Sequence, residues 1–172
     1  MTAGAGMTGD ARWRVRTIGP ADRAWLRGLL DARWGGPWQA YGGELVDASG
    51  AAGFVALTAA GTKVGVLLHR PVAGGWEIVL LDAVHSGKGI GTVLLEACAG
   101  SARSAGAARL TLVTTNDNLR ALRFYQRRGF RLAALRPGAV DAARRERKPA
   151  IPEIGEDGIT IRDELVLERE LG

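Results

Sequence analysis

The stretch from Leu80 to Val93, LLDAVHSGKGIGTV, constrains the fold more than any other part of the chain. It starts within an apolar, β-forming run, Glu77 to Val84, and continues into a turn that holds Gly87, Gly89 and Gly91 before a helical pattern begins. Glycines at such a junction let the backbone bend sharply and leave N–H groups open at the positive end of the new helix. The stretch therefore predicts a strand, an anion-binding turn and a helix, with a phosphate or pyrophosphate as the anion.

Three phosphate-binding motifs compete for this turn, and the spacing of their residues separates them. The P-loop needs four residues between its glycines and then Lys with Ser or Thr, which residues 87–92 do not supply. The dinucleotide fingerprint needs a third glycine three places after the second, and this chain has Thr92 or Leu94 there. A third pattern fits residues 86–91 (SGKGIG): Gln or Arg, Gly three places on, and Gly or Ala two places later, with Ser86 as the one departure. This pattern resembles the acetyl-CoA pyrophosphate loop of the GNAT superfamily of N-acetyltransferases.

A second motif lies downstream, in residues 118–130 (NLRALRFYQRRGF). It is similar to the segment N-x-x-A-x-x-F/L-Y-x-x-x-G-F of the same superfamily. The two motifs occur in the expected order, are joined by a helix and a strand of suitable length, and together cover Trp76 to Leu135. The resemblance implies an α/β (α+β) fold, the GNAT acyl-CoA N-acyltransferase fold. Its sheet is expected to be mixed and mostly antiparallel, with six or seven strands, helices on both faces and a splayed pair of parallel strands.

The length of the chain limits the number of domains. A chain of 172 residues can form one domain with a sizeable core and is too short for two ordinary ones. Residues 11–172 are therefore predicted to form a single N-acetyltransferase domain. Residues 1–10 are expected to form a flexible tail, and the sequence leaves open whether Met1 or Met7 is the true start.

Charge and cysteine content bear on which partners the protein binds and in which cellular compartment it lies. The formal charge of +5 suits a polyanionic cofactor as well as nucleic acid, so it does not decide between them, and nucleic acid rests on charge alone. Cys98 is the only cysteine, which excludes an intramolecular disulfide, and with two histidines it makes no recognisable metal set. No apolar run reaches the length of a membrane span, and the start of the chain lacks the features of a signal peptide. A cytoplasmic protein is expected, with no membrane partner.

Hydrophobic periodicity predicts the other elements. Period two along the strand of residues 76–84 is expected to put Glu77, Val79 and Leu81 on one face. The segment between residues 34 and 53 reads as irregular, with aromatic side chains that either pack onto the core or line the acceptor pocket. The extension at residues 137–160 has no explanation in the sequence. Strands are predicted at residues 12–18, 54–58, 63–70, 76–84, 110–114, 130–135 and 164–170, and helices from Pro20 to about residue 34 and at residues 90–106, 118–128 and 139–147.

The resemblance also implies a set of residues that bind acetyl-CoA. In the superfamily, pantetheine lies between the two splayed strands and bonds to the exposed backbone of the first, here Val79 to Leu81. The N–H of Leu81 would also polarise the thioester carbonyl. Lys88 is expected to strengthen anion binding in the turn, since Ser86 replaces the usual long side chain. The predicted cofactor-binding residues are Val79, Leu81, Ser86, Gly87, Lys88, Gly89, Ile90, Gly91, Thr92, Asn118 and Tyr125.

Two residues are predicted to carry protons. Tyr125 matches the superfamily tyrosine that protonates the departing thiolate, although an aromatic at that position also suits a helix core. Glu77 lies where many relatives carry a carboxylate that takes the amine proton directly or through water, and it also suits an exposed strand position. Asp82 and His85 are weaker candidates for the base. Asn118 fits either a helix cap or a cofactor hydrogen bond.

The sequence thus predicts an enzyme that moves the acetyl group of acetyl-CoA to a primary amine of a small molecule or a protein. Direct attack in a ternary complex is the expected route, and a homodimer is one expected form of assembly. The alternative of a different class is a non-catalytic acyl-CoA-binding or sensing domain with the same fold. The identity of the amine cannot be predicted from the sequence, because the acceptor pocket is built from its least patterned segments.

Overall fold

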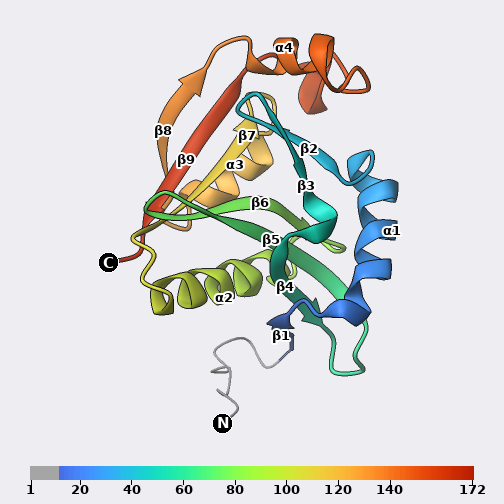
Figure 1. Ribbon diagram of the computed structural model, residues 1–172, viewed down its shortest axis with the longest axis vertical. Helices are drawn as coiled ribbons and strands as arrows, with labels where there is room; N and C mark the ends of the chain where they lie inside the picture. Colours follow the sequence, from blue (N-terminus) through green and yellow to red (C-terminus); the bar gives the residue numbers. More distant parts are fainter. Residues whose placement is uncertain (1–11) are drawn as a thin grey trace.

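The computed structural model describes residues 12–172, and the predicted tail of residues 1–10 lies outside them. Seven strands form one mixed sheet, three helices pack on its two faces, and a fourth lies at one end (Figure 1). The predicted α/β fold is confirmed. The strands of the sheet are β1 (Arg14–Thr17), β4 (Ala52–Leu57), β5 (Lys63–Val72), β6 (Gly75–Ala83), β7 (Arg109–Thr115), β8 (Arg131–Arg136) and β9 (Glu164–Glu170), and the helices are α1 (Arg23–Trp34), α2 (Ile90–Ser104), α3 (Leu119–Gln126) and α4 (Ala139–Glu146).

The strands follow the order β1-β4-β5-β6-β7-β9-β8 across the sheet. Neighbouring strands are antiparallel except β6 and β7, which run parallel because α2 crosses over between them. One core cluster gathers under α2 and α3, and a second gathers under α1 on the opposite face. Each strand of the centre is therefore buried on both faces, as the nearly continuous apolar runs of β4 and β5 indicate.

The prediction of an irregular segment between residues 34 and 53 is wrong. Two short antiparallel strands, β2 (Trp38–Tyr41) and β3 (Glu44–Asp47), form a hairpin there, followed by a 3-10 turn at Ala48–Gly50. The connection is Gly42-Gly43, and both glycines have positive φ, 54° and 85°. Two-residue turns of this kind close hairpins, so the signal was present in the sequence. The two strands are too short to show a clear alternation of apolar and polar residues, and for that reason the hairpin was not predicted.

The predicted alternation of faces along β6 is also wrong, because the strand carries a bulge. Leu68 pairs with Leu80 while the next residue, His69, pairs with Ile78, so Val79 is the extra residue on β6. A bulge shifts the side chains beyond it to the other face. Leu81 consequently packs against the α2 cluster, whereas Val79 lies in the α1 cluster.

Candidate active site

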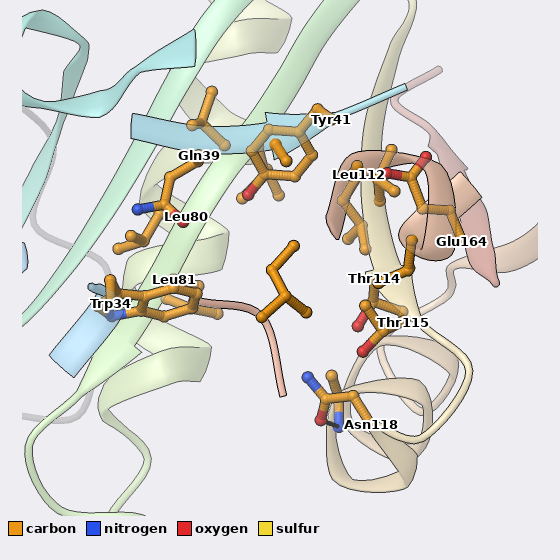
Figure 2. Close-up of a pocket in the computed structure, with 18 of the residues that line it drawn as sticks. Trp34, Gln39, Tyr41, Leu80, Leu81, Leu112, Thr114, Thr115, Asn118 and Glu164 are labelled. Atoms are coloured by element: carbon orange, nitrogen blue, oxygen red, sulfur yellow. Dashed lines mark hydrogen bonds between the residues drawn. The ribbon is translucent and has the colours of Figure 1, made fainter. Parts of the chain in front are cut away.

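A cavity of about 270 Å³ lies where β6 and β7 separate. The last residues paired between these strands are Ile78 and Leu112, although β6 continues to Ala83 and β7 to Thr115. Figure 2 shows the cavity between two sets of side chains, with Tyr41 at its upper end. One set comprises Trp34, Gln39, Leu80 and Leu81, and the other comprises Leu112, Thr114, Thr115, Asn118 and Glu164.

The backbone of Val79 to Leu81 borders this cavity, past the end of the pairing with β7. Backbone N–H and C=O groups at such a position need a partner, because buried polar groups without one are costly. An extended amide-containing chain such as pantetheine meets that need by continuing the strand pairing that β7 abandons. The separated strands thus fit the arm of acetyl-CoA.

The glycine turn at the end of β6 is open to solvent and leads directly into α2. Gly87 and Gly89 have φ values of 76° and 81°, and Gly89 is the N-cap of the helix. A Cβ at either position would meet no atom within 4 Å, so the space in front of the turn is clear for a ligand. The indole N–H of Trp13 donates to the carbonyl of Lys88 over 2.9 Å and fixes the turn against β1. The turn therefore offers unobstructed N–H groups at a helix N-terminus, as an anion site requires.

Arginines of α3 and its C-terminal end surround a second hollow of about 650 Å³ beside the turn. The guanidinium of Arg128 donates to the Thr92 hydroxyl from Nε (3.1 Å) and from a terminal nitrogen (2.6 Å), and it stacks over the ring of Phe124 at 3.8 Å. We assigned no binding role to these four arginines from the sequence. The hollow is lined by Gly87, Thr92, Arg120, Arg123, Phe124, Arg127 and Arg128.

Tyr125 lies in the wall of the first cavity, with only 7% of its surface exposed. Its ring packs edge-on against Phe124 and Phe130, at centroid distances of 5.0 and 5.3 Å. Burial, with a smaller effect of Cys98, raises the pKa of Tyr125 well above its ordinary value. The phenol therefore stays protonated, which suits a proton donor. Asn118 also lines the cavity and caps α3, since its side chain accepts from the Ala121 N–H over 3.1 Å.

The candidate bases lie around the cavity without reaching its wall. Glu77 is 13% exposed and accepts a hydrogen bond of 2.6 Å from Arg70 Nε. Asp82 is buried, and one carboxylate oxygen accepts from Arg33 Nε and from the indole of Trp34, at 2.8 and 2.7 Å. Asp82 thus holds Trp34, a residue of the cavity wall. His85 is exposed to solvent and lies just before the glycine turn.

Residues 24–130 match the acetyltransferase (GNAT) family. The chain belongs to this GNAT family. It is 40% identical over 144 residues to the Bacillus subtilis (strain 168) protein YdhI, a match that covers 84% of this chain and 89% of YdhI. GNAT enzymes transfer acyl groups from acetyl-CoA, so the protein is an acyltransferase with acetyl-CoA as its co-substrate.

Solved structures share the fold. An acetyltransferase from Elizabethkingia anophelis with acetyl-CoA bound has a TM-score of 0.67 and 19% identity, with 94% of this chain and 99% of that one covered. The IAA acetyltransferase from Bacillus cereus ATCC 14579 has a TM-score of 0.66 and 23% identity, with 92% and 99% covered.

Glu164 is a site residue that our sequence reasoning missed. It begins β9, is 4% exposed and lines the cavity. Its carboxylate accepts from the Gly42 N–H, at 3.2 Å for Oε1 and 3.1 Å for Oε2, and Oε2 lies 3.2 Å from an Arg136 nitrogen. Only the sheet order brings β9 beside β7, so no local pattern in the sequence indicates that this carboxylate reaches the cavity.

The extension between β8 and β9, residues 137–163, forms a roof over the same cavity. Val140, Ala143, Lys148 and Ile151 belong to this roof and line the cavity. Figure 1 shows α4, in orange, above the ends of β7 and β9 and beside the turn of the β2–β3 hairpin. The ammonium of Lys148 donates to the carbonyls of Trp34 and Trp38, both over 3.1 Å, and so joins the roof to α1 and the hairpin.

The described residues contain no group of three or more His, Cys, Asp or Glu side chains placed to hold a metal ion. Within residues 12–172, no helix is both long and apolar enough to cross a membrane.

Proposed function

We propose that this GNAT protein is an N-acetyltransferase that moves the acetyl group of acetyl-CoA to a primary amine by direct attack in a ternary complex. The observation that carries the proposal is a single cavity lined by the unpaired edge of β6, by Tyr125 and by residues of the roof. Donor and acceptor can meet there without a covalent enzyme intermediate. Bound acetyl-CoA supplies an activated thioester carbonyl.

The roles of the binding residues follow from their positions. The N–H groups of the glycine turn and the N-terminus of α2 bind the pyrophosphate. The flexible side chain of Lys88 adds a positive charge. The arginines of the second hollow lie next to the turn and balance the remaining phosphate charge of CoA. The backbone of Val79 to Leu81 orients the arm, and the Leu81 N–H donates to the thioester oxygen as charge develops on it.

The protons move in opposite directions. Tyr125 donates its phenolic proton to the departing thiolate, which needs one to leave as a thiol. Glu77 accepts the amine proton through a water molecule, because its carboxylate does not line the cavity and cannot contact the amine directly. The carboxylate is held in place by its pairing with Arg70. Cys98 is no alternative nucleophile, because it is fully buried and burial raises the pKa of its thiol to about 12. That free thiol agrees with the cytoplasmic location that we propose.

The test is release of free CoA from acetyl-CoA across a panel of small primary amines and short peptides with free N-termini. Thiol release that depends on one acceptor, together with a product heavier by one acetyl group, is expected. A protein that binds acetyl-CoA in calorimetry but acetylates no amine would instead be a non-catalytic acyl-CoA sensor.

A further inference from the structure

We propose that Glu164 binds the ammonium group of the acceptor, and that the acceptor is a small primary amine with a compact, mostly apolar body. This inference rests on the proposed function and names the substrate class of the same site. Three observations carry it: the size of the cavity, its closure by the roof, and the placement of one carboxylate in its wall.

The cavity is small for two substrates. Its volume of about 270 Å³ lies below the roughly 300 to 1,000 Å³ that is usual for drug-sized ligands. Part of this space borders Val79 to Leu81 and Tyr125, which the acetyl-bearing arm of CoA would occupy. What is left for the acceptor holds a small molecule and not a stretch of polypeptide.

The roof is held in place by hydrogen bonds, so the acceptor side of the cavity is covered by an ordered segment. Arg144 donates to the carbonyls of Ile151, Pro152 and Ile161, at 3.0, 2.9 and 2.7 Å. Asn116 donates to the Thr160 carbonyl and accepts from two roof N–H groups. A peptide substrate needs an open groove for the residues that follow its N-terminus, and the roof covers that side of the cavity.

Gly155 fixes a second part of the roof against the start of α3. A Cβ added there would lie 1.9 Å from a carboxylate oxygen of Asp117, so the roof backbone packs directly on that buried side chain. The Asp117 carboxylate also accepts from the Thr115 hydroxyl at the end of β7. The roof is thus tied to both the strand and the helix that border the cavity.

Glu164 has the geometry to receive an ammonium group. Among the described residues that line the cavity it carries the only carboxylate, and Oε1 has one protein partner, an N–H that it shares with Oε2. A carboxylate offers about four acceptor positions, so Oε1 retains capacity for a ligand. Hydrogen bonds between an ammonium group and a carboxylate are charge-assisted and strong, so this position suits a cationic partner.

The charges around Glu164 leave it as the anionic end of the cavity. Arg136 is 43% exposed along its side chain and reaches Glu164 through one nitrogen at 3.2 Å. Lys148 is the only cation among the lining residues, and it is engaged by two main-chain carbonyls. Glu77 is paired with Arg70, and Tyr41 stays neutral because burial raises its pKa. The other walls are mostly apolar or aromatic, including Trp34, which suits an apolar body behind the ammonium.

The first experiment measures acetylation of 2-phenylethylamine by the wild type, Glu164→Gln and Arg136→Gln. Glu164→Gln keeps the shape and a hydrogen-bond acceptor but removes the charge, so KM for the amine should rise about 10- to 100-fold, with acetyl-CoA affinity unchanged. Arg136→Gln removes the ion pair but keeps the carboxylate, and KM should stay close to that of the wild type. Equal losses in both variants would mean that Glu164 only holds the hairpin turn, and would overturn the proposal.

The second experiment does not depend on turnover. Calorimetry on the CoA-bound protein compares 2-phenylethylamine with 2-phenylethanol, which has the same body and no charge. Glu164→Gln should weaken binding of the amine and leave binding of the alcohol unchanged. Equal binding of amine and alcohol by the wild type would overturn the proposal, even if an acceptor of another kind is acetylated.

The substrate class is tested with the tripeptide Ala-Phe-Ala, which presents a free N-terminal amine on a chain. Its kcat/KM should be far below that of 2-phenylethylamine, because a cavity of about 270 Å³ that also receives the arm of CoA has little room for the residues that follow the N-terminus. A higher value for the peptide would contradict the small-acceptor assignment while the proposed N-acetyltransferase activity would stand. Ammonium binding without transfer to any amine would refute the proposed activity and leave the Glu164 assignment intact.

Discussion

Tyr125 lies in the cavity wall, and its hydroxyl is the one group that a phenylalanine would lack. If that hydroxyl protonates the thiolate, Tyr125→Phe should lower kcat by about 100- to 10,000-fold, the usual worth of a positioned acid. Affinity for acetyl-CoA should barely change, because the ring contacts with Phe124 and Phe130 persist. Steady-state kinetics and calorimetry on one preparation check both statements. Turnover near that of the wild type would mean that solvent protonates CoA.

Glu77 makes a separate prediction about turnover. Glu77→Gln should lower kcat by about 100- to 10,000-fold, the usual worth of a positioned base, and Arg70→Gln, which removes its ion-pair partner but keeps the carboxylate, should lower it far less. Because burial raises the pKa of Tyr125 above its ordinary value of about 10, the acid stays protonated through pH 9 and causes no fall in rate there. Steady-state rates of both variants, measured from about pH 6 to about pH 9, test these statements. Turnover near that of the wild type in Glu77→Gln would assign the base to another group.

Prediction at the level of single residues was better for motif positions than for positions that depend on packing. Tyr125 and Asn118 line the cavity, and both come from a motif with fixed spacing on one helix. Leu81 lies on the face opposite to the predicted one because of the bulge at Val79, and periodicity does not reveal a bulge. Glu164 was missed because its position depends on sheet order, which a local pattern does not specify.

The glycine turn is the element with the clearest test. Gly89→Val places a branched side chain in the space before the N-terminus of α2 and should lower acetyl-CoA affinity by at least about tenfold, since pyrophosphate needs close backbone approach. Gly106→Val is the matched control, because Gly106 follows the other end of α2 with a φ of 79° against 81° and has equally open surroundings. Both variants carry similar backbone strain, so only the first should lose the ligand. Calorimetry showing equal affinities would refute the loop assignment.

A buried ion cluster holds the start of α1 to the sheet. Asp22, with a side chain 2% exposed, accepts from Arg16 at 2.6 Å and lies 3.1 Å from Lys63. The Arg16 hydrogen bond is the main cause that holds the pKa of Asp22 well below its usual range. A carboxylate with a lowered folded-state pKa contributes stability above its unfolded pKa of about 4, and that contribution is lost as pH falls further.

Asp22→Asn should therefore destabilise the protein at pH 7 by about 1 to 2 kcal/mol, because it removes the charge-assisted hydrogen bonds of a buried carboxylate while the partly exposed Arg16 and Lys63 stay solvated. The loss of stability between about pH 4 and pH 2 should be shallower in the variant than in the wild type. Urea unfolding at several pH values measures both. An equally steep acid loss in the two proteins would mean that Asp22 does not titrate with folding.

Most elements were predictable because their residues repeat with a clear period. The hairpin of β2 and β3 was not, since each strand has only four residues and its support comes from contacts with distant parts of the chain. One such contact is the Gly42 N–H on Glu164. The sequence did not explain the roof, because its position over the cavity is set by the folded structure and not by a local pattern.

At the scale of the whole molecule, a single cavity collects parts from β6, β7, α3, the hairpin, β9 and the roof. This convergence is the basis of the proposed direct transfer between two bound substrates. The described lining residues include no cysteine, and Cys98 lies on the buried face of α2, in the core. A ternary complex, as proposed above, requires that both substrates occupy this cavity at the same time.

Initial rates over a matrix of acetyl-CoA and amine concentrations test this central claim most directly. If both substrates occupy the cavity together, double-reciprocal lines should intersect, and acetyl-CoA alone should leave no acetyl group on the protein by mass spectrometry. Parallel lines, with a protein heavier by one acetyl group after incubation with acetyl-CoA, would show a ping-pong route and contradict the account.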